Sequence, residues 1–241
     1  MRQHYLSAIK LTSTIPAESY LNDIPAIAWL SENGELPINA DVTFFVGENG
    51  SGKSTLLEAA AVACGFNAEG GSRNAAFSTA ETHSELWEHI LAVKSAYPRD
   101  GYFLRAESFY NVATYLENLP QGGITYGDKM LHEMSHGESF LSLVVNRFRG
   151  RGLYILDEPE AALSPQRQLT LLSCMHDLVN DGSQFIIATH SPILMAYPGA
   201  EILRFDEEGI TPVSYKETEH YRVTKGFLDS PERMMNILFG K

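Results

Sequence analysis

Residues 41–57, DVTFFVGENGSGKSTLL, decide the fold of this chain. A β-prone apolar run leads into the glycine-rich segment GENGSGKS at 47–54, and helix-forming residues follow it. We therefore expect a strand, a loop and a helix in that order. Glycines let such a loop curl until several N–H groups point to one spot at the positive end of the helix, which suits a polyphosphate. The residues expected to bind it are Gly47, Asn49, Gly50, Ser51, Gly52, Lys53, Ser54 and Thr55.

Two side chains of this loop suit the charges of a phosphate chain and its metal ion. Lys53 would reach the β- and γ-phosphates, and the Ser54 hydroxyl would bind Mg²⁺. The alternative is a glycine-rich surface turn that happens to precede a lysine. That alternative leaves the strand before the loop and the helix after it unexplained.

Composition limits the remaining possibilities. The chain has 241 residues, of which 44% are hydrophobic, enough for one large domain or one domain with a smaller lobe. No run approaches the ~20 apolar residues that span a bilayer, and the N-terminus lacks the apolar core of a signal peptide. Cys64 and Cys174 are too few for a disulfide framework, so we expect buried free thiols and a cytoplasmic protein. The net charge of −12 argues against a broad nucleic-acid surface but leaves a local groove in an assembly open.

Two further segments carry chemistry. In HEMSHGESF, residues 132–140, a Ser/Gly turn opens a helix whose N–H groups could bind an anion. In GLYILDEPE, residues 152–160, an apolar run typical of a buried parallel strand ends in two carboxylates, where a ligand site is expected. Adjacent acids at a strand end are costly without a cation, so Asp157 suits Mg²⁺ and Glu158 suits polarising a water molecule. The alternative is a solvated corner between strand and turn.

A histidine follows the next apolar run. Residues 185–188, FIIA, are expected to form another buried strand, and His190 comes directly after it in THSP. Parallel strands present their carboxyl ends at one edge of a sheet. His190 is therefore a candidate for contact with a γ-phosphate.

These motifs resemble those of the ABC-type ATPase domain. The resemblance is to its soluble, non-transporter branch, which contains the SMC-like and RecF-like proteins and many stand-alone AAA/ABC ATPases. It extends from Tyr5 to about Phe205. In chain order, GENGSGKST (47–55) is similar to Walker A, MSHGES (134–139) to the ABC signature, LYILDEPE (153–160) to Walker B, AALSP (161–165) to the D-loop and THS (189–191) to the switch-histidine motif.

The resemblance implies Mg²⁺-dependent ATP hydrolysis, with Glu158 and His190 as catalytic residues. It also implies that Ser135 and Gly137 touch the γ-phosphate held by a second subunit, in a head-to-tail homodimer that shares two ATP sites. Glu107 stands where the family has the glutamine of the Q-loop, and would approach the metal. Other departures are His136 for glycine and Glu138 for glutamine in the signature, and Ser164 for aspartate in the D-loop.

The expected fold class is α/β: a P-loop NTPase of ABC-ATPase type. It has a central, mostly parallel sheet, an N-terminal antiparallel β part and an inserted helical lobe. We expect a single domain over residues 1–241, with a core lobe at about 1–64 and 150–241 and the inserted lobe at about 65–149. Local patterns predict a small antiparallel sheet over 12–40, a helix over 83–97 and an edge hairpin over 201–215.

Two residue groups have competing interpretations. Tyr5 is either a half-buried packing residue or a residue that stacks on an adenine ring. Residues 230–238, SPERMMNIL, predict a capped helix that docks on its own domain or, alternatively, binds a partner through its methionines.

Three classes of function fit such a site. The first is an ATPase switch or motor that acts on a partner protein, in genome maintenance or in defence against phages and mobile elements. The second is the ATP-binding subunit of a membrane transporter. The third, a small-molecule phosphotransferase, would leave the signature, the acid pair and His190 unexplained. Long coiled-coil arms are excluded, because residues 56–133 are too few and contain glycine and proline.

Overall fold

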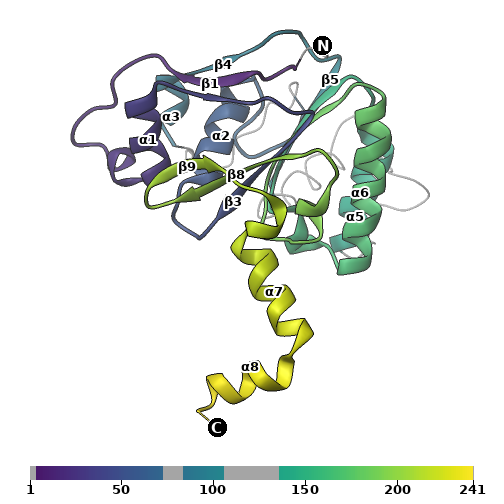
Figure 1. Cartoon of the computed structure of the whole chain (residues 1–241). Helices are drawn as coiled ribbons and strands as arrows, with labels where there is room; N and C mark the ends of the chain where they lie inside the picture. The colour runs from purple at the N-terminus through teal and green to yellow at the C-terminus, as the bar shows by residue number, and fades with distance from the viewer. Residues whose placement is uncertain (1–3, 73–83, 106–135, 241) are drawn as a thin grey trace.

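The computed structural model describes residues 4–72, 84–105 and 136–240, which form two β-sheets with helices around them (Figure 1). The smaller sheet is antiparallel, in the order β2-β1-β4. Its strands are β1 (Ala8–Leu11), β2 (Glu35–Pro37) and β4 (Ile90–Val93). The larger sheet has the order β5-β6-β7-β3-β8-β9 and is parallel except for its edge strand β9. Its strands are β3 (Val42–Gly47), β5 (Asp100–Arg105), β6 (Gly152–Asp157), β7 (Gln184–Ala188), β8 (Glu201–Asp206) and β9 (Gly209–Pro212).

Helices cover both faces of the larger sheet. The smaller sheet, α1, α2 and α3 lie on one side of it, and α5 and α6 lie on the other (Figure 1). The α-helices are α1 (Pro25–Asn33), α2 (Lys53–Ala63), α3 (Leu86–His89), α5 (His136–Arg147), α6 (Pro165–Asn180), α7 (Glu219–Asp229) and α8 (Pro231–Leu238). Short 3₁₀ turns are η1 (Tyr20–Asp23), η3 (Pro159–Ala162), η4 (Leu194–Ala196) and η5 (Tyr215–Glu217). The mostly parallel sheet, the antiparallel N-terminal part and the β8–β9 edge hairpin are as expected.

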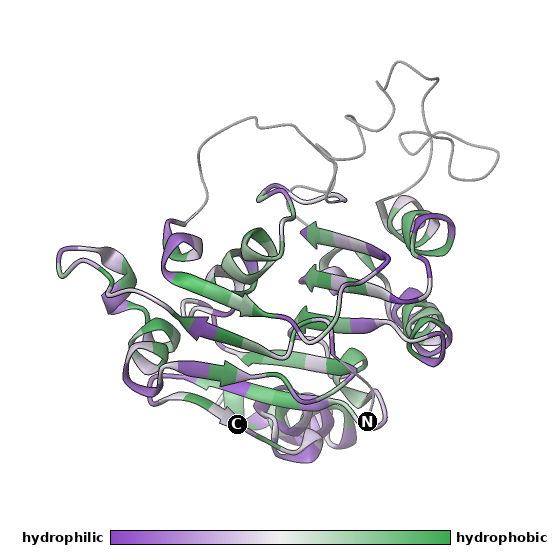
Figure 2. Cartoon of the chain, turned by 90° about the horizontal axis from the view of Figure 1, so that it is seen from above, coloured by the Kyte–Doolittle hydropathy of each residue, from purple (hydrophilic) through white to green (hydrophobic). Residues whose placement is uncertain are grey.

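The central strands are apolar along their whole length because both of their faces are buried. Successive side chains of a strand point to opposite faces of the sheet. Phe45 and Ile186 pack in the core with α1, α2 and the smaller sheet, whereas Phe44 and Phe185 pack in the core with α5 and α6. All four are fully buried. Figure 2 shows green, hydrophobic colour on much of the central sheet, with purple segments on some strands, and mixed colour on the helices around it.

The antiparallel sheet expected over residues 12–40 is only partly present. β2 pairs with β1, but the apolar piece at 24–30 belongs to helix α1. Pro25 takes the first helical position and Gly34, at φ +79°, ends the helix. Proline at the start and glycine just past the end are helix signals, although they also resemble interruptions in a strand. The buried face of α1 consists of Ala26, Ile27 and Leu30.

The helix expected over residues 83–97 is wrong beyond its first turn. After the short α3, Ile90–Val93 form β4, which pairs with β1. β5 also falls within the segment 65–149 that was expected as an inserted helical lobe, yet it pairs with β6 in the central sheet. Of the rest of that segment, α5 is helical and residues 106–135 lie outside the described residues.

Polar contacts join the two sheets at the end of the strands opposite to His190. The Gln184 side chain accepts from the N–H of Leu6 and donates to the carbonyl of Leu6, both at 2.9 Å. Beside it, the Tyr5 hydroxyl donates to the carbonyl of Gly182 at 3.0 Å. Tyr5 is therefore a half-buried packing residue, and it does not lie where it could stack on a nucleotide bound at the glycine loop of its own chain.

The last two helices, α7 and α8, extend away from the rest of the molecule (Figure 1). Neither contains a buried residue, so the expected docking of residues 230–238 on their own domain is wrong. Large apolar side chains are exposed along both helices, among them Val223, Leu228, Ile237 and Leu238. None of the helices in the described residues has the length and apolar character needed to cross a membrane.

Candidate nucleotide site

The glycine loop joins β3 to α2, and close contacts restrict two of its positions to glycine. Gly47 has φ +144°, and a Cβ there would lie 2.0 Å from the backbone oxygen of Phe205. Gly52 has φ +98°, and a Cβ there would lie 2.5 Å from Ile24. Gly50, at φ +83°, has open space where its side chain would be. The chain therefore turns tightly into the first turn of α2, whose N–H groups have no partner within the helix.

Lys53 is held by its own loop. Its Nζ donates to the carbonyls of Gly47 and Glu48, both at 2.7 Å, and the residue is only 4% exposed. Burial lowers the pKa of the Lys53 amine, while the carboxylates of Glu158, Asp157 and other acids raise it. A buried ammonium with these partners is suited to exchange a loop carbonyl for a phosphate oxygen.

Ser54 and Asp157 meet although they are 103 residues apart. The Ser54 hydroxyl donates to Oδ1 of Asp157 at 2.9 Å. Within residues 4–72, 84–105 and 136–240, no group of three or more His, Cys, Asp or Glu could hold a metal ion. Mg²⁺ does not require such a group, because it usually keeps several waters and takes one or two protein oxygens together with phosphate oxygens. The pair of oxygens fits that mode of binding.

Arg105 is a second cation, besides Lys53, near the acids at the end of the sheet. It is paired with Asp157 in the register of β5 and β6, and its Nε lies 3.7 Å from Oδ2 of that residue. Its Nη1 also contacts Oε2 of Glu58, a buried residue of α2, at 2.5 Å. Arg105 thus partly neutralises the charges of Glu58 and Asp157, and on Asp157 it approaches the oxygen that Ser54 does not contact.

Glu158 and His190 face each other across the ends of β6 and β7. Glu158 has a left-handed backbone, with φ +48° and ψ +50°, which is uncommon for a residue with a side chain. Its Oε1 lies 3.6 Å from Nε2 of His190. That buried Nε2 has no hydrogen-bond partner among the described residues. Burial, and then the charge of Lys53, lower the pKa of His190.

Two more side chains hold His190. The Glu160 carboxylate accepts from the backbone N–H of His190 at 2.5 Å, and burial raises the pKa of Glu160. The Nδ1 atom of His190 lies 2.9 Å from Nε2 of His220, in the first turn of α7. Burial, and then the neighbouring His190, lower the pKa of His220.

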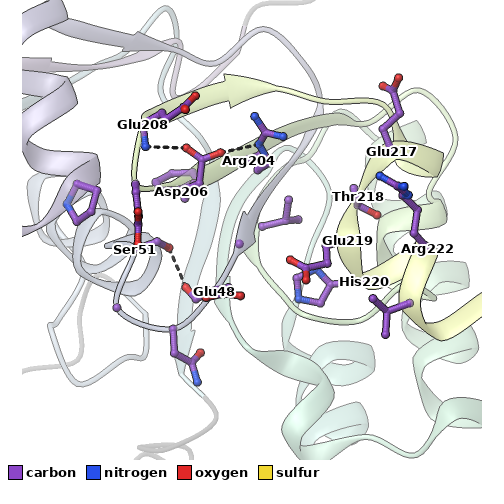
Figure 3. A pocket seen from close by; sticks show the side chains of 18 of the residues that line it. Glu48, Ser51, Arg204, Asp206, Glu208, Glu217, Thr218, Glu219, His220 and Arg222 are labelled. Carbon is purple, nitrogen blue, oxygen red and sulfur yellow. Dashed lines mark hydrogen bonds and ion pairs between the residues drawn. The ribbon is translucent and has the colours of Figure 1, made fainter. Parts of the chain in front are cut away.

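A pocket of about 1170 Å³ opens on the outer side of the glycine loop. Figure 3 shows Glu48 and Ser51 of the loop on one side of it, and Glu219 and His220 from the start of α7 on the other. Lys53, Ser54 and Asp157 do not line this pocket, so it adjoins these predicted site residues without containing them.

The structure thus brings five of the predicted site residues together: Lys53, Ser54, Asp157, Glu158 and His190. Asn49 is exposed on the loop, Ser51 donates to the carbonyl of Glu48, and Thr55 lies half-buried in α2. Gly137 is buried at the start of α5, where a Cβ would lie 2.6 Å from Arg167 and 2.7 Å from the carbonyl of Ala162. Ser135 and Glu107 lie outside the described residues.

Sequence reasoning missed three residues of this site. Arg105 ends a strand beside Asp157, and a charge at a strand end is the signal that could have identified it. Glu160 belongs to the DEPE motif but had no assigned role. His220 has no local signal, because it lies in a polar helix 30 residues from His190.

Comparisons with known proteins agree with this arrangement. A family model described as "AAA domain" matches residues 24–102, and one described as "AAA domain, putative AbiEii toxin, Type IV TA system" matches residues 127–196. No curated protein matches the chain.

Two solved structures are similar to this chain at low sequence identity. One is part of an ABC transporter complex from Clostridium perfringens, at 18% identity and TM-score 0.49, covering 98% of this chain and 99% of that chain. Another is the SMC head domain from Thermotoga maritima, at 16% identity and TM-score 0.45, covering 89% of this chain and 100% of that chain.

The two family matches contain the motifs that the fold brings together. The first includes the glycine loop, and the second includes the signature-like, DEPE and histidine segments. The chain therefore carries the motifs of an AAA/ABC-type ATPase on two segments that match AAA-domain models.

Proposed function

We propose that this protein binds ATP with Mg²⁺ at the carboxyl ends of β3, β6 and β7 and hydrolyses its terminal anhydride bond. The observation that carries the proposal is the 2.9 Å hydrogen bond between Ser54 and Asp157. This hydrogen bond joins the first turn of α2, where N–H groups can bind phosphate, to the acidic end of β6, where carboxylates can bind Mg²⁺. Groups for the anion and for its metal ion therefore lie next to each other.

Each side chain has a task that its surroundings favour. Lys53 transfers its hydrogen bonds from the loop carbonyls to phosphate oxygens. Glu158 orients the attacking water and takes its proton, and His190 donates to the γ-phosphate from Nε2. Ser54 and Asp157 would hold Mg²⁺, which when bound would supply positive charge near the phosphate oxygens.

We further propose that two copies bind head to tail around ATP, with Ser135 and Gly137 of one copy facing the γ-phosphate of the other. The exposure of the site supports this: the side chain of Glu158 is 43% exposed and that of His190 is 31% exposed. A hydrolysis site gains from the exclusion of bulk water. A second copy would cover what a single chain leaves open.

The substitution Glu158→Gln tests both parts. We expect it to preserve binding of a fluorescent ATP analogue, to lower turnover by at least about 100-fold, and to accumulate dimer in ATP and Mg²⁺ during size-exclusion chromatography. The control is Lys225→Ala, which breaks only the exposed Lys225–Asp229 ion pair on α7. Turnover equal to that of the wild type would remove Glu158 from this role.

Dimer formation has its own test. Ser135→Arg should prevent the ATP-dependent dimer while a single subunit still binds nucleotide. An unchanged dimer would count against a signature that acts across the interface.

The ATP cycle is proposed to drive a partner protein, in genome maintenance or in defence against phages or mobile elements. Support comes from the family description of residues 127–196, which refers to a toxin–antitoxin system. Affinity purification of the Glu158→Gln protein from its native host tests this. A cytosolic nuclease, a toxin or another nucleic-acid enzyme would support the proposal, and a membrane permease would indicate the transporter alternative.

A further inference from the structure

We propose that His220 is a positioning residue for His190: it fixes the tautomer and the orientation of the His190 ring. The consequence for hydrolysis rests on the function proposed above, whereas the contact itself does not. The two rings meet edge to face, with 5.0 Å between their centroids and an interplanar angle of 63°. Nδ1 of His190 and Nε2 of His220 are 2.9 Å apart, a normal hydrogen-bond length.

The first turn of α7 is anchored beside His190, so this contact belongs to a fixed arrangement. The Tyr215 hydroxyl donates to the carbonyl of Pro192, two residues beyond His190, at 2.9 Å. Thr218 is 1% exposed, and its hydroxyl caps α7 by accepting from the N–H of Tyr221 at 3.3 Å. Farther along, α7 has no buried residue. His220 therefore lies where the helix is attached to the rest of the chain.

The surroundings decide which ring carries the shared proton. A hydrogen bond between two neutral imidazoles needs one N–H donor and one acceptor nitrogen. Nε2 of His190 faces the Glu158 carboxylate, which only accepts hydrogen bonds when ionised. His190 must then carry its proton on Nε2, which leaves Nδ1 as the acceptor. His220 is consequently the donor, through its own Nε2–H.

Neutral rings are what the electrostatics of the site favour. Burial lowers the pKa of both histidines, and Lys53 lowers both further. With His220 as donor, the Nε2–H of His190 points toward Glu158, where a donor to a phosphate oxygen is required. Glu160 adds a second constraint by holding the backbone N–H of His190. His190 is thus held through its backbone N–H and through Nδ1, while Nε2 faces Glu158.

Three variants separate this role from a structural one. His220→Leu removes the hydrogen bond and keeps an apolar side chain of similar length. His220→Gln keeps a donor near the position of Nε2. Lys225→Ala is the control on an exposed part of α7. Side-chain ¹⁵N–¹H spectra of protein with labelled histidine, with His190 assigned by its own substitution, report the tautomer without any turnover.

We expect His190 to carry its proton on Nε2 in the wild type, in His220→Gln and in Lys225→Ala, and to become a tautomer mixture in His220→Leu. In ATPase assays, His220→Leu should lower kcat by about 10- to 100-fold, as loss of an orienting partner does at other sites. KM and the Kd of a nonhydrolysable analogue should stay unchanged. His220→Gln should restore most of kcat.

Each result decides a different question. An unchanged His190 tautomer in His220→Leu, in a protein whose melting curve shows it to be folded, overturns the inference. So does a variant that loses analogue binding together with kcat. If the wild type hydrolyses no ATP while the tautomer still depends on His220, the proposed function fails and the positioning role stands.

Discussion

Removing Arg105 tests whether the acidic end of the sheet depends on this cation. The Arg105 side chain is 24% exposed, and it contacts Oε2 of Glu58 at 2.5 Å and Oδ2 of Asp157 at 3.7 Å. The side chains of Glu58 and Asp157 are 8% and 9% exposed. Arg105→Gln would leave two buried acids beside each other without their nearest guanidinium. We expect this to lower the free energy of unfolding.

The structure sets the size of the effect. Loss of one partner from a buried ion pair costs about 3–5 kcal/mol. Because Arg105 keeps part of its surface in water, which weakens each interaction, we expect the lower end, about 3 kcal/mol. For a chain of this size such a change lowers Tm by roughly 6–12 °C.

Urea denaturation in EDTA measures this quantity, with Glu58→Gln and the double variant completing a cycle. Glu58→Gln should cost less than Arg105→Gln, because Arg105 keeps Asp157 as a partner and part of its surface in water, and it should recover part of the loss when combined with Arg105→Gln. Addition of Mg²⁺ should stabilise Arg105→Gln more than the wild type, because the ion supplies charge to Asp157. An Arg105→Gln protein within about 0.5 kcal/mol of the wild type would refute this account of the site.

Three further outcomes are expected. Ser54→Ala removes one oxygen beside Asp157, so it should weaken binding of an ATP analogue by about 10-fold in Mg²⁺ and leave binding in EDTA unchanged. Fluorescence titration measures both affinities. Equal losses of affinity in the two buffers would contradict a role of Ser54 in metal binding. Burial, and then the neighbouring His190 ring, lower the pKa of His220. As the pH falls below the ordinary histidine pKa of about 6.5, His220 therefore takes up a proton in the unfolded chain more readily than in the folded chain. The wild type should therefore lose Tm relative to His220→Gln between about pH 7.5 and about pH 5, and a constant difference would show that His220 does not contribute. Gly52→Ala should lower the free energy of unfolding by about 3 kcal/mol, because the backbone is left-handed and the new Cβ would lie 2.5 Å from Ile24. Gly34→Ala, which has a left-handed backbone but open space around its Cβ, should cost about 1 kcal/mol. Urea denaturation curves that coincide for the two variants would show that the contact with Ile24 does not contribute.

Where sequence prediction failed, local signals were ambiguous. Pro25 and Gly34 mark the start and end of α1, but the same residues interrupt strands, and the nine-residue helix is too short for its periodicity to decide. Residues 90–93 have apolar side chains in a pattern that also fits a helix. These residues form a strand because they pair with β1, and the contacts that stabilise the strand are with residues about 80 positions away in the sequence.

What the sequence by itself determined is which polar residues follow the central strands. The glycine loop, Ser54, Asp157, Glu158 and His190 could be identified because each stands directly after an apolar run, and parallel strands present such ends at one edge. Local conformation, a strand followed by a turn, is enough to predict that arrangement.

The tertiary structure alone decided what surrounds those groups. Arg105 meets Asp157 because β5 pairs in register with β6, and His220 meets His190 because η5 is anchored to Pro192 and places the first turn of α7 beside the end of β7. Neither contact follows from spacing along the chain. Both result from strand order and helix placement, which depend on how the whole chain buries its apolar surface.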